Sequence, residues 1–221
     1  MERWVQLVCM VKQHPPVDET DTPIWGLEPN GLFLVKSFYK QINFGGVVSD
    51  ISPKMWKILC PQNIHVFLWL CVHNKILTRD NLAKRREVED PSCLFCAEFE
   101  TVQHLLFDCV VAQQVWNLIA DMFNIDRISR FTKIMSFWHR HKEKAVLNMV
   151  TTAALWSLWR SRNEFCFQGR KWKNVKCILA KLSCFLHQWM VLYDDGQAKL
   201  LQRCILLLDK RRGELLRIAW K

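Results

Sequence analysis

Apolar residues recur at helical spacing through most of the chain, and the residues that interrupt helices are concentrated near its start. All seven prolines lie at or before Pro91, and no glycine occurs between Gly46 and Gly169. Long helices are therefore expected mainly in the second half of the chain. Helices are predicted at residues 36–44, 53–59, 64–73, 79–86, 101–107, 110–123, 142–167, 174–192 and 197–219, with a basic connector before residue 142.

The same pattern leaves little room for β structure. Residues 32–35 are apolar and follow Gly31, so one short strand is predicted there, followed by a helix with Ser37 as its cap. Three regions are expected: an irregular amino-terminal segment at 1–30, a small helical domain at 31–126 and a helical region at 127–221. The predicted fold class is mainly α, with at most this minor strand.

Charge divides the chain at about the same place. Residues 1–126 carry 11 Lys or Arg and 15 Asp or Glu, a net charge of −4, whereas residues 127–221 carry 20 and 6, a net charge of +14. A basic region of this size attracts polyanions such as nucleic acid or an acidic membrane surface. A solvated helical face that keeps the protein in solution explains the charge equally well.

Composition indicates a protein with a hydrophobic core in a reducing compartment. Half of the residues are apolar, and the ten cysteines are scattered rather than arranged as a short disulfide scaffold. The first residues lack the apolar stretch of a signal peptide, and the longest apolar run, residues 66–72, is too short to cross a membrane. An intracellular protein of the nucleus or cytoplasm, without membrane association, is therefore expected.

Three cysteines and one histidine within seventeen residues indicate a metal site. Cys93 and Cys96 can supply two thiolates from one tight turn, and His104 and Cys109 can complete a tetrahedron around zinc. On one continuous helix His104 and Cys109 would point about 140° apart, so the helix must break near Asp108. The alternative is a group of buried thiols beside a core histidine. Because four protein ligands leave no position for water, the sequence predicts one structural zinc ion.

An ordered series of motifs surrounds these four residues. It comprises Gly31-x-Phe33-x-Val35-Lys36-Ser37-x-Tyr39, Trp56-Lys57, Pro61, Phe67-x-Trp69, Ile76-Leu77-Thr78-x-Asp80-Asn81-Leu82-Ala83-Lys84-Arg85, Cys93-x-x-Cys96, Glu100-Thr101-Val102-Gln103-His104-Leu105, Cys109 and Val115-Trp116.

With these motifs, the segment from about 31 to 123 resembles the zinc-binding domain attached to reverse transcriptases of plant non-LTR (LINE-type) retrotransposons. Leu34 departs from the family, which more often has Ser or Thr there. Residues 158–167 look like the helical region that follows this domain in such elements. The resemblance implies that Cys93, Cys96, His104 and Cys109 are zinc ligands, and that the domain assists nucleic-acid handling by a parent polymerase.

No catalytic constellation is recognisable. Tyr193-Asp194-Asp195-Gly196 lacks the residue that separates the aromatic from the aspartates in a polymerase, and helical patterns flank it, so it is interpreted as a turn. Phosphate-binding loops, nucleophile elbows and the four carboxylates of a ribonuclease H are not recognisable either. The chain is expected to be no enzyme, to have no small-molecule substrate, and to lack the polymerase and ribonuclease H domains.

The expected partner is RNA or DNA, bound through phosphates with low sequence specificity. The candidate binding residues are Lys84, Arg85, Arg86, Arg160, Arg162, Arg170, Lys171, Lys173 and Lys176. Trp172 could stack on an unpaired base, although an aromatic packed between helices is the commoner case. Two other interpretations stay open: a zinc-stabilised scaffold that pairs through the carboxy-terminal helices with a protein partner or a second copy, and a decaying retroelement fragment without a selected role.

Overall fold

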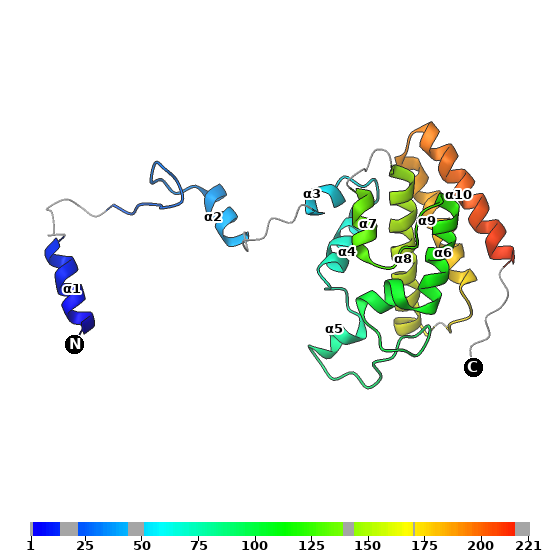
Figure 1. The fold of residues 1–221 in the computed structure, drawn as a ribbon, viewed down its shortest axis with the longest axis horizontal. Helices are drawn as coiled ribbons and strands as arrows, with labels where there is room; N and C mark the ends of the chain where they lie inside the picture. Colours follow the sequence, from blue (N-terminus) through cyan, green and yellow to red (C-terminus); the bar gives the residue numbers. More distant parts are fainter. Residues whose placement is uncertain (1, 14–21, 44–50, 139–143, 170, 215–221) are drawn as a thin grey trace. The chain divides into compact units, whose positions relative to one another are not determined.

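The computed structural model describes residues 2–13, 22–43, 51–138, 144–169 and 171–214 (Figure 1). The chain divides into two compact units, residues 1–49 and residues 50–221. The first unit contains α1 (Glu2–Gln13) and α2 (Val35–Asn43). The described residues are mainly helical, as predicted, and their β structure is limited to one isolated bridge between Ser92 and Phe99.

An aromatic cluster organises the described part of the first unit. The ring of Trp25 lies 4.9 Å from Phe33 and 5.9 Å from Phe38 between centroids. Its Nε1 donates a hydrogen bond of 2.7 Å to Ser37 Oγ, which in turn donates to the carbonyl of Leu34 at 2.9 Å. The start of α2 is thus tied to the loop that precedes it.

Two predictions about this segment are wrong. Residues 32–34 form no strand, because no neighbouring strand in the described residues offers its backbone groups a partner. Ser37 lies inside α2 and is not its cap, since the helix already begins at Val35. Residue 44, the predicted end of this helix, lies outside the described residues.

The second unit is a helical assembly. Its helices are α3 (Ile51–Met55), α4 (Gln62–Val72), α5 (Arg79–Ala83), the π turn η1 (His104–Asp108), α6 (Val110–Phe123), α7 (Phe131–Trp138), α8 (Ala145–Phe167), α9 (Lys176–Trp189), the 3-10 turn η2 (Met190–Leu192) and α10 (Asp195–Glu214). Helix α7 lies in the segment interpreted as a basic connector, and its apolar face is buried through Ile134, Phe137 and Trp138. None of the helices in the described ranges is both long and apolar enough to traverse a bilayer.

Helix α8 lies at the centre of this unit and contacts α4, α6, α7, α9, α10 and η1 (Figure 1). Because neighbours surround it, α8 is buried on nearly every side, as at Leu155 and Leu158, which have no exposed surface. Elements on both sides of the predicted boundary near residue 126 therefore share one core.

A buried ion pair joins α8 to the segment before η1. Glu100 is fully buried, and its carboxylate accepts hydrogen bonds from Arg162 Nη2 at 2.6 Å and from the backbone N–H of Arg79 at 2.8 Å. Arg162 is 1% exposed and lies over the ring of Trp159. The prediction that Arg162 binds nucleic acid is therefore wrong, because its guanidinium is enclosed and neutralised by Glu100.

We expect Glu100→Gln to lower the free energy of unfolding by about 3–5 kcal/mol, because it leaves the buried Arg162 charge without its partner. Adding Arg162→Met should restore much of this loss, since the double variant buries no charge. Urea unfolding followed by circular dichroism measures both effects.

The control is Glu214→Gln, which removes the carboxylate of an exposed pair with Arg211. This change should alter stability by less than about 1 kcal/mol. Equal losses in Glu100→Gln and Glu214→Gln would contradict the role assigned to the buried pair.

Candidate metal centre

The first two candidate ligands lie on a tight turn held by its own backbone. The N–H of Ala97 donates to the carbonyl of Cys93 at 2.9 Å, and the N–H of Cys93 donates to the carbonyl of Glu98 at 2.5 Å. The N–H of Phe95 points at Cys93 Sγ from 3.5 Å, which favours a thiolate there. Ala97 has φ +62°, a left-handed conformation that is strained for a residue with a Cβ, and it turns the chain immediately after Cys96.

The second pair of ligands lies at the two ends of a π turn. The N–H of Cys109 donates to the carbonyl of His104, five residues earlier, at 2.8 Å. In a segment with hydrogen bonds of this span, one helical turn takes about five residues. The side chains of His104 and Cys109 therefore lie on the same side of the segment. Thr101 Oγ1 caps the start of this segment by accepting from the N–H of His104 at 3.0 Å.

The predicted break is confirmed. Cys109 leaves the helical conformation with ψ 135° and is the N-cap of α6. The spacing of His104 and Cys109 requires a break near Asp108; the structure adds the π turn, which removes the 140° separation. Cys109 also lies at the amino end of a helix, where the helix dipole favours a negative sulfur.

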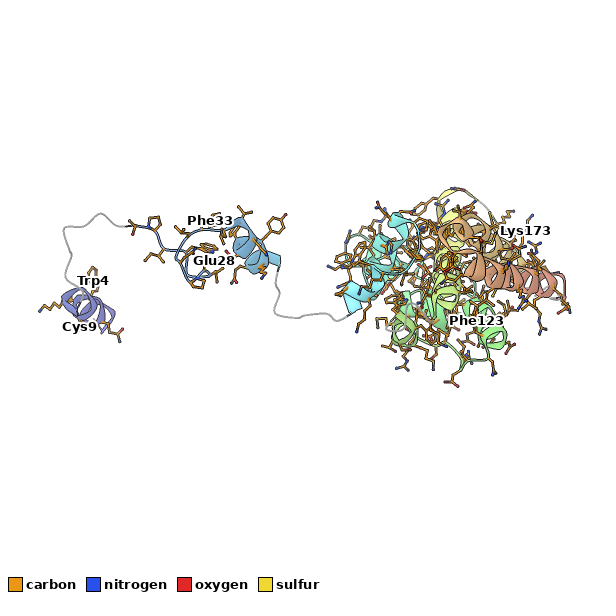
Figure 2. All side chains as sticks on the ribbon, turned by 90° about the horizontal axis from the view of Figure 1, so that it is seen from above. Trp4, Cys9, Glu28, Phe33, Phe123 and Lys173 are labelled. Atoms are coloured by element: carbon orange, nitrogen blue, oxygen red, sulfur yellow. The ribbon has the colours of Figure 1, made fainter. Side chains whose placement is uncertain are left out.

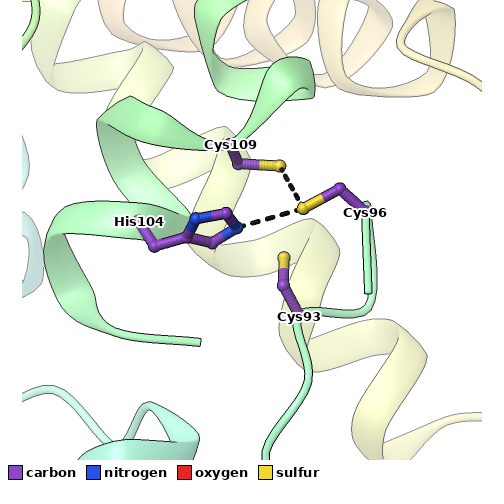
Figure 3. Close-up of side chains that lie close together, drawn as sticks. All are labelled: Cys93, Cys96, His104 and Cys109. Atoms are coloured by element: carbon purple, nitrogen blue, oxygen red, sulfur yellow. Dashed lines mark hydrogen bonds between the residues drawn. The ribbon is translucent and has the colours of Figure 1, made fainter. Parts of the chain in front are cut away.

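The four side chains converge on one point (Figure 3). Their ligand atoms all lie within 4.8 Å of one another, with Cys96 Sγ 3.1 Å from His104 Nε2 and 3.5 Å from Cys109 Sγ. Zinc bonds of about 2.0–2.3 Å in a tetrahedron require ligand separations of about 3.3–3.8 Å, so small side-chain movements would complete the site. Three sulfurs and an imidazole nitrogen are a donor set that suits zinc.

The three cysteines can all be thiolates at this site only when a cation is bound among them. The hydrogen bond with Cys109, followed by burial, raises the pKa of Cys93. Burial raises the pKa of Cys96, and the hydrogen bond with Cys93 raises the pKa of His104. A divalent ion must therefore displace protons from these groups when it binds, and its affinity depends on pH.

These four residues supply all four ligands of a structural zinc site of the Cys3His class, with Cys93 and Cys109 buried and Cys96 and His104 half-buried. Residues 33–116 match the family model described as zinc-binding in reverse transcriptase. The match confirms the resemblance over that segment and supports the assignment of one zinc ion to the four-residue cluster.

A similar protein from Arabidopsis thaliana bears the name "Putative ribonuclease H protein". It is 25% identical over 97 residues, which are 42% of this chain and 16% of that protein. This chain thus covers only a small part of its relative. No solved structure matches the chain.

The other cysteines take no part in the cluster. Cys60, Cys71 and Cys204 are buried, whereas Cys9 and Cys184 are exposed. Cys60 Sγ lies 3.6 Å from His65 Nε2, but that nitrogen also lies 2.9 Å from the carbonyl of Ile58, and burial raises the pKa of Cys60 to about 12. This pair is consequently no activated nucleophile.

The turn interpretation holds for residues 193–194, which link η2 to α10, whereas Asp195 and Gly196 already belong to the first turn of α10. Asp194 Oδ1 accepts a hydrogen bond of 2.8 Å from the N–H of Gln197, so Asp194 caps α10. A polymerase would need this carboxylate as a metal ligand, whereas here it satisfies the start of a helix.

The predicted nucleic-acid residues differ in their accessibility. Arg162 is buried, as described above, and Arg170 lies outside the described residues. Arg160 is exposed, with its guanidinium 5.9 Å from the ring centre of Trp156. The other exposed candidates are Lys84, Arg85, Arg86, Lys171 and Lys173, and Lys176 is half-buried at the start of α9.

Phe95, which lies between the first two ligands, has a role that was not predicted from the sequence. Its ring is 4.9 Å from Trp172 and 5.9 Å from Phe165. Trp172 therefore packs against the metal turn, in agreement with the packing alternative and not with a free stacking surface. An apolar residue inside a Cys-x-x-Cys turn indicates that the turn packs against a core. The sequence does not indicate which residues Phe95 contacts, because these partners are about 70 residues away.

We expect the purified protein to contain about one equivalent of zinc, and Cys109→Ser to lose it together with helicity, because metal binding stabilises this segment. Elemental analysis and circular dichroism measure the two effects. The matched control is Cys184→Ser, which changes an exposed thiol outside the cluster and should keep its zinc. Equal zinc content in both variants would contradict the assigned ligands.

Zinc should leave the protein as the pH falls. The pKa values of Cys93, Cys96 and His104 are all raised, so protons compete with the metal increasingly as solutions become more acidic, and binding is strongest at neutral to alkaline pH. A chromogenic zinc chelator should report faster release at pH 5 than at pH 8. Release that does not depend on pH would contradict ligation by thiolates.

Proposed function

We propose that this chain is a non-catalytic, retrotransposon-derived zinc-binding protein that binds single-stranded RNA or DNA with low sequence specificity. The observation that carries the proposal is the contact between Phe95 of the metal turn and Trp172, which has an exposed lysine on each side. The retroelement origin is supported by the reverse-transcriptase zinc-binding match over residues 33–116. That match includes no catalytic domain.

The aromatic contact gives the zinc centre a role in binding. Phe95, Phe165 and Trp172 form a cluster in which every pair of ring centres lies within 5.9 Å. The backbone of Lys171 and Lys173 is thereby held against the turn that contains Cys93 and Cys96. Zinc fixes the turn, and the turn fixes the position of two cations that can contact phosphates.

Other exposed cations extend this surface in the proposal. Lys173 lies at the surface of the second unit (Figure 2). Arg160 is held over Trp156 on α8, and Lys84, Arg85 and Arg86 follow α5. Such contacts neutralise phosphates without reading bases, which explains why low sequence specificity and strong salt dependence are expected.

A protein-interaction scaffold is the second candidate. Helix α10 leaves Leu200, Leu206 and Leu207 exposed by 47%, 60% and 47%. A partner helix could cover these leucines, and light scattering across a concentration series would report self-association.

We expect the double variant Lys171→Ala/Lys173→Ala to bind labelled single-stranded RNA at least about tenfold more weakly than the unchanged protein. Losing two phosphate contacts should also reduce the slope of log affinity against log salt by about 1.4. Fluorescence anisotropy between 50 and 300 mM salt measures both quantities.

Lys199→Ala/Arg203→Ala is the control, because it removes two exposed charges of α10. Equal effects in the two double variants would show that only net charge matters, which would contradict a positioned surface. Removing zinc with a chelator should weaken binding of the unchanged protein as much as the first double variant does.

A further inference from the structure

Helix α10 has apolar residues on its exposed side as well as on its buried side. It lies at the outside of the second unit and contacts α8, α9 and η2 (Figure 1). Leu201 and Leu208 are buried on the side that packs against these elements, whereas Leu200, Leu206 and Leu207 are exposed. A helix covered on one side usually has polar residues on the other, so the exposed leucines need an explanation.

The exposed side of α10 repeats every seven residues. Leu200 and Leu207 are seven residues apart, as are Arg203 and Lys210, and all four side chains are exposed. Residues at this interval lie on one face of a helix, about 10 Å apart along its axis. The four residues thus have the alternating three- and four-residue spacing along which two helices pack in a coiled coil. We call this set of four residues the α10 seam.

A hollow lies at the amino-terminal end of the α10 seam. Its volume is about 220 Å³, and Leu200 forms part of its wall together with the apolar side chains of Phe123, Val146 and Leu147. Protein interfaces commonly hold one large side chain of the partner in a pocket of this kind. The seam therefore presents a surface for a helix and, at one end, a pocket for an anchoring side chain.

The charge of the α10 seam determines which helix fits it. Arg203 and Lys210 lie within the seam, and neither has an ion-pair partner among the described residues. Lys199 and Arg211 flank the seam and are exposed as well. A partner with carboxylates opposite these cations would gain electrostatic complementarity, and a basic or neutral partner would not.

Three other occupants fit the α10 seam less well. In a parallel pair of copies Arg203 would face Arg203 and Lys210 would face Lys210, and in an antiparallel pair each cation would face a leucine. A nucleic-acid strand would contact the cations but leave the leucines in water. A bilayer surface requires a continuous apolar face, whereas Arg203 separates Leu200 from Leu207.

We propose that the α10 seam binds an acidic amphipathic helix of another protein. Apolar residues of that helix cover Leu200 and Leu207, and its Asp or Glu residues contact Arg203 and Lys210. This inference rests on the proposed scaffold role and gives the partner a chemical class. It does not depend on the binding of RNA at residues 171–173.

The test uses two labelled, alanine-rich peptides of three heptads. Both have leucine at the first position of each heptad, and the fourth position is glutamate in one peptide and lysine in the other. Fluorescence anisotropy should show that the full-length protein binds the glutamate peptide at least about tenfold more tightly than the lysine peptide, because only the former places carboxylates opposite Arg203 and Lys210.

Two double variants examine the leucines and the cations separately. Leu200→Gln/Leu207→Gln should weaken binding of the glutamate peptide at least about fivefold and leave the melting temperature unchanged, because both positions are exposed. Arg203→Glu/Lys210→Glu should reverse the preference, so that the lysine peptide binds more tightly.

Lys171→Glu/Lys173→Glu is the matched control, because it changes the net charge by the same amount at exposed positions outside α10. It should keep the preference for the glutamate peptide and weaken the binding of single-stranded RNA. Arg203→Glu/Lys210→Glu should have the smaller effect on RNA.

Several outcomes would overturn the inference. Equal binding of the two peptides would do so, as would a preference that survives in Arg203→Glu/Lys210→Glu. Self-association seen by light scattering and lost in Leu200→Gln/Leu207→Gln would identify a second copy as the occupant instead. Binding to vesicles of anionic lipid that the same variant loses would identify a membrane. The RNA-binding proposal depends on the RNA titration alone, so the two proposals can fail separately.

Discussion

Residues 84–101 form no regular helix, and their only β contact in the described structure is the bridge between Ser92 and Phe99. The backbone N–H and C=O groups of such a segment are not paired in regular helices or sheets. The segment therefore needs other restraints to hold one conformation. Two are present: the convergence of Cys93, Cys96, His104 and Cys109, and the buried carboxylate of Glu100. The metal centre fixes the middle of the segment through Cys93 and Cys96, and Glu100 attaches its carboxy-terminal end to the central helix α8.

These restraints are connected through packing. Phe95 leaves the metal turn and meets Trp172 and Phe165, while Glu100, a few residues on, meets Arg162 on the same helix as Phe165. The turn is therefore attached to α8 by an ion pair and by aromatic contacts. Loss of the metal should loosen these contacts as well as the turn, so a site without open coordination positions would still affect the surface proposed to bind a polyanion.

Much of this arrangement could be predicted from local sequence. The four ligands, the break near Asp108 and most helices follow from spacing and hydrophobic periodicity, which are properties of neighbouring residues. Arg162 could not be placed, because its sequence neighbours are typical of an exposed basic helix and its partner Glu100 is 62 residues away. Ser37 was misassigned because α2 begins two residues earlier, at Val35, and its hydroxyl instead accepts from the indole N–H of Trp25 in the preceding loop. The hollow beside α10 joins residues 123, 146 and 200, which no local pattern connects.

The π turn fixes the number of residues between His104 and Cys109. The hydrogen bond from Cys109 to His104 spans five residues, and both of its ends carry ligands. One residue more or fewer would rotate Cys109 away from the imidazole and shift the start of α6, which no side-chain adjustment could offset. Length variation among related sequences should therefore spare the interval from His104 to Cys109.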